Sequence, residues 1–77
     1  IKNQYEITNT LYLKSLSLES EMKIDSAIVV LNQILEFDSL NANAYNKLGQ
    51  IYGQHKNDFR VSEHFLLKAY EIEPTNF

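Results

Sequence analysis

The chain has 77 residues, of which 44% are hydrophobic and 22% are charged, and its formal net charge is −3. Its seven Lys and Arg residues are scattered, which argues against nucleic-acid binding, since a phosphate-binding surface needs clustered cations. The absence of cysteine excludes disulfides, thiolate zinc sites and a cysteine nucleophile. No apolar run approaches the ~18 residues of a membrane span, so direct membrane insertion is not expected.

Four helices are predicted in chain order. Their ranges are 5–20, 24–38, 42–55 and 58–73. In the second range, Ala27, Leu31 and Ile34 follow the i, i+4, i+7 spacing of one helical face, and the later ranges keep a similar spacing. Sustained alternation of apolar and polar residues is absent, so strands are not expected. The fold class predicted from this pattern is all-α.

Capping and helix-ending residues agree with these boundaries. Asn41 is placed to cap the helix that starts near Ala42, and either Asn57 or Asp58 to cap the last helix. Pro74 cannot continue a helix and marks the end of the last one. The connections of about two or three residues force neighbouring helices to run antiparallel.

The chain also contains an internal repeat. At a spacing of 35 positions, the matched pairs include Ile24 with Phe59, Ala27 with Ser62, Leu31 with Leu66, Ile34 with Ala69, and Asn41 with Asn76. At a spacing of 34 positions, they are Leu11 with Tyr45, Ser15 with Gly49, and Leu18 with Tyr52. The change of spacing predicts one extra residue in the loop 54–57. Lys14 is an exception, because it stands opposite the apolar Leu48.

A period near 34 made of two antiparallel helices is typical of helical repeats. Residues 41–52, with Tyr45, the Leu48-Gly49 pair and Tyr52, closely resemble the first half of the tetratricopeptide repeat (TPR) signature. Residues 68–74 resemble its end. The resemblance implies TPR-type antiparallel helix hairpins stacked as an α-solenoid fragment. It divides the chain into an unassigned lead-in or extension of the first helix (1–8), a first repeat (9–41) and a second repeat (42–77).

The resemblance also implies how the helices pack. Small residues allow close helix crossings, here at Ala27, Gly49, Ser62 and Ala69. Large residues are expected to fill the gaps around them, namely Leu31, Tyr45, Tyr52, Phe59 and Leu66. The first helix departs from the signature, since Lys14 and Ser15 replace the Leu-Gly pair.

Catalytic, cofactor and metal sites are not expected. The two histidines fall on a loop (His55) and a helix surface (His64), with no third ligand at helical spacing. Two acidic pairs, Glu19 with Glu21 and Glu36 with Asp38, are expected to be solvated charges at or near helix ends. The serines have no nearby His and acid that could make one of them a nucleophile. The chain is therefore predicted not to be an enzyme and to need no cofactor.

Two groups of residues are candidates for binding a partner. In the family, one face of each first helix lines an inner groove. That face carries Tyr12 and Leu16 in the first repeat, and in the second it carries Asn43, Asn46, Gln50 and Gln54. The alternatives are packing of the first pair against preceding residues and a merely solvated amide face. Family members that clamp the terminal carboxylate of a peptide place Lys and Arg along this face beside Asn. No basic residue is expected along the face here, which argues against that mode of binding.

The expected function is a protein–protein interaction scaffold that binds a partner protein or peptide. The alternative is a regulatory or substrate-docking arm of a larger enzyme, and a third possibility is an assembly module that binds through its convex face. The chain begins with Ile1 rather than Met, so it is expected to be an internal fragment or processed product. The last helix carries more apolar residues than one buried stripe can hold, namely Phe65, Leu66, Leu67 and Tyr70. A further repeat or another subunit is therefore expected to cover this helix.

Overall fold

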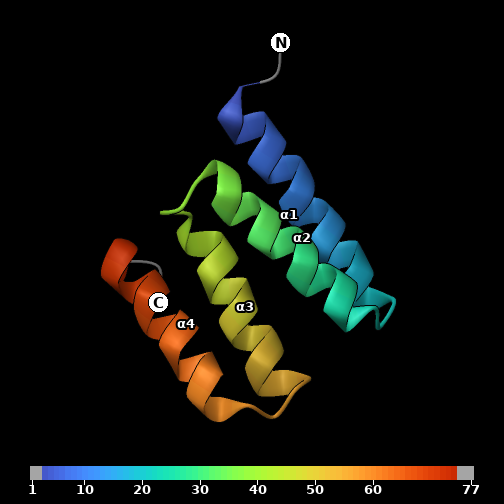
Figure 1. Cartoon of the computed structure of the whole chain (residues 1–77), viewed down its shortest axis with the longest axis vertical. Coiled ribbons are helices and arrows are strands. Elements are labelled where there is room, and N and C mark those ends of the chain that lie inside the picture. Colours follow the sequence, from blue (N-terminus) through green and yellow to red (C-terminus); the bar gives the residue numbers. More distant parts are fainter. Residues whose placement is uncertain (1–2, 75–77) are drawn as a thin grey trace. The chain divides into compact units, whose positions relative to one another are not determined.

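The computed structural model describes residues 3–74, which form four α-helices and no strand (Figure 1). The helices are α1 (Gln4–Ser20), α2 (Ile24–Phe37), α3 (Ala42–Gln54) and α4 (Phe59–Ile72). Each boundary lies within one residue of the predicted one, so the all-α prediction is confirmed for these residues. Within the predicted lead-in, α1 already begins at Gln4. Residues 1–2, and the match of Asn41 with Asn76, lie outside the described part.

The chain divides between Ser39 and Leu40 into two compact units. Each unit is an antiparallel helical hairpin, in which α1 packs against α2 and α3 packs against α4 (Figure 1). The predicted hairpin pairing of consecutive helices is therefore present in both units.

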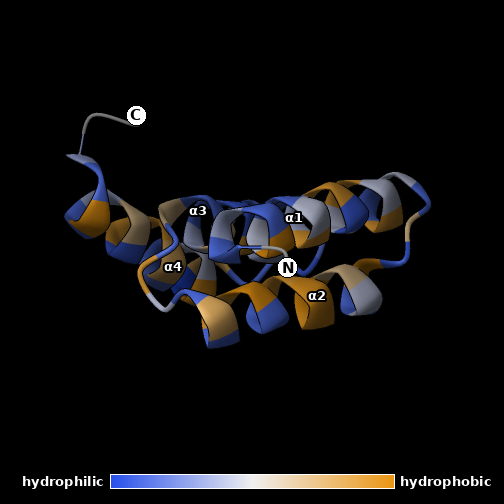
Figure 2. Cartoon of the chain, turned by 90° about the horizontal axis from the view of Figure 1, so that it is seen from above, coloured by the Kyte–Doolittle hydropathy of each residue, from blue (hydrophilic) through white to orange (hydrophobic). Residues whose placement is uncertain are grey.

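In the first hairpin, the buried side of α2 follows the predicted spacing. Ala27, Leu31 and Ile34 are fully buried, and Val30 nearly so. Figure 2 shows apolar residues along much of α2. At the open end of the hairpin, the side-chain amide of Gln4 donates to the backbone carbonyl of Phe37, which ties the start of α1 to the end of α2.

Three of the four helices begin with a side-chain cap. Asn3 accepts a hydrogen bond from the Glu6 amide at 2.9 Å, and Asn41 accepts one from Ala44 at 2.9 Å. Asp58, rather than Asn57, caps α4 by accepting from the Val61 amide at 3.2 Å. Each cap satisfies an amide that has no partner inside its helix. The predicted cap of α3 is confirmed, and the choice between Asn57 and Asp58 is settled.

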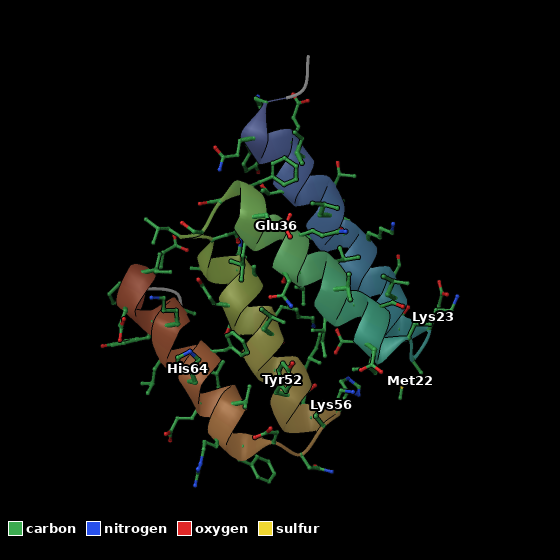
Figure 3. The ribbon with its side chains drawn as sticks, viewed as in Figure 1. Met22, Lys23, Glu36, Tyr52, Lys56 and His64 are labelled. Atoms are coloured by element: carbon green, nitrogen blue, oxygen red, sulfur yellow. The ribbon has the colours of Figure 1, made fainter. Side chains whose placement is uncertain are left out.

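The turn between α1 and α2 ends α1 with a left-handed residue. Met22 has φ of 61°, and its amide donates to the Glu19 carbonyl at 2.9 Å. The Lys23 amide donates to the Leu18 carbonyl at 2.8 Å. This pair of bonds is the Schellman arrangement, which usually has glycine at the left-handed position. Figure 3 shows Met22 and Lys23 at this turn, with their side chains directed away from the helices.

The turn between α3 and α4 is one residue longer. Asn57, 35 positions after Met22, is again left-handed with φ of 53°. Here the bond that closes the turn runs from the Asp58 amide to the Tyr52 carbonyl at 2.9 Å and spans six positions, whereas the bond from Lys23 to Leu18 spans five. The prediction of one extra residue in this loop is therefore confirmed.

The prediction that Phe59 fills a packing gap is wrong for this structure, because its side chain is 70% exposed. Phe59 is the first residue of α4. Helical side chains lean toward the N-terminus of their helix. A side chain at the first position therefore extends past the helix end, where α4 has no preceding turn to cover. Among the other predicted gap fillers, Leu31 is fully buried, while Tyr45, Tyr52 and Leu66 are half-buried.

We expect Met22→Gly to stabilise the chain by about 1 kcal/mol, since a left-handed conformation costs a residue with a Cβ roughly 1–2 kcal/mol and costs glycine little. The measurement is urea unfolding followed by circular dichroism, and the control is Met22→Ala, which removes the same exposed side chain but keeps the Cβ. Asn57→Gly should gain less, because Asn tolerates this conformation. Equal stabilities of Met22→Gly and Met22→Ala would contradict the explanation.

Candidate functional site

The rotation of α3 is set by its close approach to α4 at Gly49. A Cβ at this position would lie 2.7 Å from both Cγ and Cδ2 of Leu66 and 3.1 Å from the backbone oxygen of Ser62. The Ser62 hydroxyl donates to the Gly49 carbonyl at 2.6 Å, in a buried position. Only a residue without a side chain allows this spacing, so Gly49 must face α4.

Three aromatic rings extend the same contact along both helices. The ring of Phe65 on α4 stacks against Tyr45, with centroids 6.2 Å apart, and against Tyr52, with centroids 5.7 Å apart. Tyr52 on α3 and His64 on α4 are labelled in Figure 3. Since Tyr45 and Tyr52 are two helical turns apart, one ring of α4 holds both ends of α3 in place. Their predicted packing role is confirmed by these contacts.

The four candidate amide residues lie together on another side of α3. They are Asn43, Asn46, Gln50 and Gln54, and they form what we call the amide face of α3. With about 100° between successive helical residues, they fall within an arc of about 80°. Gly49 lies about 100° from the centre of this arc, and the two tyrosines lie about 140–160° from it. Asn43 and Gln54 are exposed, whereas Asn46 and Gln50 are half-buried.

The positively charged Lys47 also lies at the edge of this face, although it was not among the predicted site residues. The Lys47 ammonium donates to the Gln50 side-chain oxygen at 3.5 Å, and Lys47 is half-buried. The three-residue spacing from Lys47 to Gln50 was the available signal, because residues three apart are neighbours on a helix. The expectation that the amide face has no basic residue beside it is therefore corrected.

The other two candidates lie together on α1. Tyr12 and Leu16 are one turn apart and both half-buried. Tyr5, one further heptad toward the start of the helix, lies on the same side and is 75% exposed. We call these three residues the tyrosine stripe of α1. Tyr5 was not among the predicted candidates, although its seven-residue spacing from Tyr12 was visible in the sequence.

Other chemistry-bearing residues do not gather into a site within residues 3–74. His55 is the half-buried C-cap residue that follows α3, and His64 is exposed on α4. No group of three or more His, Asp and Glu side chains is arranged to hold a metal ion in this range. Every buried side-chain nitrogen and oxygen there has a hydrogen-bond partner. None of the four helices is both long and apolar enough to cross a membrane.

Comparison with known proteins identified no relative of the chain. No protein-family model, curated protein or solved structure matches the chain. The resemblance to the TPR signature therefore rests on the residues of this chain alone.

We expect Gly49→Ala to destabilise the chain by roughly 1 kcal/mol. In an ordinary helix interior this change would gain up to about 1 kcal/mol. Here the new methyl group would press on Leu66 and on the Ser62 backbone, and overpacking costs about 1–3 kcal/mol. The measurement is chemical unfolding followed by circular dichroism.

Gly53→Ala is the matched control on the same helix. Its Cβ would meet only the Ser62 side chain, at 3.0 Å from Oγ, so the expected change is smaller. In the double variant Gly49→Ala with Leu66→Ala, the loss of stability should be smaller than the sum of the two single losses. Leu66→Ala frees the space that the new methyl group at position 49 needs. A stabilised Gly49→Ala variant would show that the close approach is absent.

Proposed function

We propose that the chain is a non-catalytic scaffold of the TPR type that binds a peptide or an extended segment of a partner protein. The observation that carries this proposal is the amide face of α3. Four amide side chains are held on one side of a helix whose rotation is set elsewhere, by Gly49 and the aromatic contacts. A rigid helix that presents several amides in register is suited to recognition rather than to a chemical step.

The repeat architecture within the proposal is supported by matched burial in the two hairpins. Ser15 and Gly49 are both buried, and Ser15 turns its hydroxyl back to its own helix by donating to the Tyr12 carbonyl at 2.6 Å. Ala27 and Ser62, 35 positions apart, are also both buried. Small residues at the same points of two hairpins favour one repeated design, which we interpret as a fragment of an α-solenoid.

The binding mechanism follows from the chemistry of the amide groups. Each Asn or Gln side chain donates through its nitrogen and accepts through its oxygen. The amide face can therefore bind the backbone N–H and C=O groups of an extended peptide, which present the same two functions alternately. Lys47 adds a positive charge at one edge, which favours a peptide with an acidic group beside the segment that contacts Gln50.

The tyrosine stripe of α1 offers a different kind of contact. Tyrosine combines a large apolar ring with a hydroxyl, so it contributes contact area and one hydrogen bond at small cost in side-chain entropy. The tyrosine stripe is therefore suited to binding an apolar side chain of the partner.

The test uses a peptide selected for binding to the purified chain from a random, surface-displayed library. We expect the double substitution Asn46→Ala and Gln50→Ala to weaken binding of that peptide about ten-fold or more. Each lost hydrogen bond contributes about 0.5–1.5 kcal/mol, and 1.4 kcal/mol corresponds to ten-fold. Isothermal titration calorimetry measures the affinity.

The control is Gln33→Ala, which removes the same type of side chain from an exposed position on α2. It should leave the affinity unchanged, and circular dichroism should show the same helix content in every variant. Equal affinities of the double variant and the Gln33→Ala control would place the binding site elsewhere. The amide face would then be only a solvated surface.

A further inference from the structure

Met22 holds the only sulfur atom of the chain, which has one methionine and no cysteine. Its side chain is 68% exposed at the turn between α1 and α2, and it is directed away from both helices (Figure 3). Thioethers in proteins are oxidised to sulfoxides, and exposure favours the reaction. An oxidant that attacks sulfur therefore has one target in this sequence, and that target lies on the surface.

The backbone at Met22 has a conformation that methionine rarely adopts. Met22 and Asn57 are the two non-glycine residues with positive φ within residues 3–74, at 61° and 53°. Asn tolerates the left-handed region because its short polar side chain hydrogen-bonds locally, which a thioether does poorly. At the position that matches Asn57 across the repeat, the first hairpin thus keeps an exposed thioether on a strained backbone. Strain of this kind is typical of residues with a functional role.

Packing does not account for methionine at this position. A side chain that is 68% exposed removes little apolar surface from water. The hydrogen bonds of the turn are made by the backbone, from the Met22 amide to the Glu19 carbonyl and from the Lys23 amide to the Leu18 carbonyl. The charged neighbours Glu21 and Lys23 pair with each other at 3.2 Å. The turn therefore depends on the backbone of Met22 rather than on its thioether.

We infer that the thioether of Met22 is a site of reversible oxidation by hydroperoxides. In the forward step, a sulfur lone pair attacks the outer oxygen of the hydroperoxide, the O–O bond breaks and an S–O bond forms. Sulfur is oxidised, the peroxide is reduced, and water leaves when the oxidant is hydrogen peroxide. In the reverse step, a pair of thiols in a reductase becomes a disulfide, and the sulfoxide oxygen leaves as water.

Oxidation changes what the turn presents without removing a contact that the hairpin needs. The thioether is apolar, whereas the sulfoxide is polar and its oxygen accepts hydrogen bonds. The backbone bonds of the turn remain, so we expect both helices to keep their structure. The inference concerns Met22 alone and does not depend on peptide binding at the amide face.

The experiment treats the purified chain of 77 residues with dilute hydrogen peroxide and follows its intact mass. The chain should gain the mass of one oxygen atom, at a rate within about three-fold of that of the same chain unfolded in guanidinium chloride, because Met22 is exposed in both states. Circular dichroism and the midpoint of urea unfolding should be the same before and after oxidation. Methionine sulfoxide reductases specific for each sulfoxide epimer, supplied with a dithiol, should together remove the oxygen.

Two variants assign the reaction to the turn. Met22→Leu removes the sulfur but keeps an apolar side chain of similar size, so it should gain no oxygen under the same conditions. Adding Leu31→Met to this variant moves the only thioether into the core, because Leu31 is fully buried and an exchange of Leu for Met is tolerated there. The buried thioether should be oxidised at least about ten-fold more slowly than Met22.

A larger difference between the folded and the unfolded chain than the one expected would overturn the inference, because the sulfur of Met22 would then be protected. A lowered unfolding midpoint after oxidation would do the same, and so would a sulfoxide that the two reductases leave in place. Equal oxidation rates for Met22 and the buried thioether would show that exposure at the turn does not govern the reaction, which would also overturn it.

Discussion

The second hairpin depends on the backbone of α3 coming close to α4 at Gly49, where no side chain separates the two helices. Leu66 occupies the space that a Cβ would need, and the Ser62 hydroxyl bonds the Gly49 carbonyl across the contact. A helix fixed at one point can still roll or tilt. The stacking of Phe65 on Tyr45 and Tyr52 prevents this by adding contacts one turn to either side.

This constraint determines what the hairpin can present to a partner. Once one side of α3 is committed to α4, the helical period directs the amide face away from it. Asn46 and Gln50 are then held by a rigid helix rather than by a loop, which lowers the entropy lost on binding. The proposed recognition surface is thus a consequence of packing at Gly49, although none of its residues takes part in that packing.

The first hairpin uses the same plan with a different solution at the crossing. Ser15 stands where the second hairpin has Gly49, and it remains fully buried because its hydroxyl bonds its own helix at the Tyr12 carbonyl. Lys14, which breaks the repeat in the sequence, is exposed and so costs the packing nothing. Exposed polar residues on α1, namely Thr10, Lys14 and Ser17, and exposed apolar residues on α4, namely Phe59, Leu67 and Tyr70, make the two hairpins chemically different.

The sequence by itself determined the four helices, their ends and the internal repeat, because helical periodicity and capping act over a few neighbouring residues. Asn41 and the extra loop residue were predictable for that reason. Only the tertiary structure decided that Phe59 is exposed. It also decided which of Asn57 and Asp58 caps α4. These outcomes depend on where a helix begins in space and on how side chains are directed, and the order of residue types does not specify either.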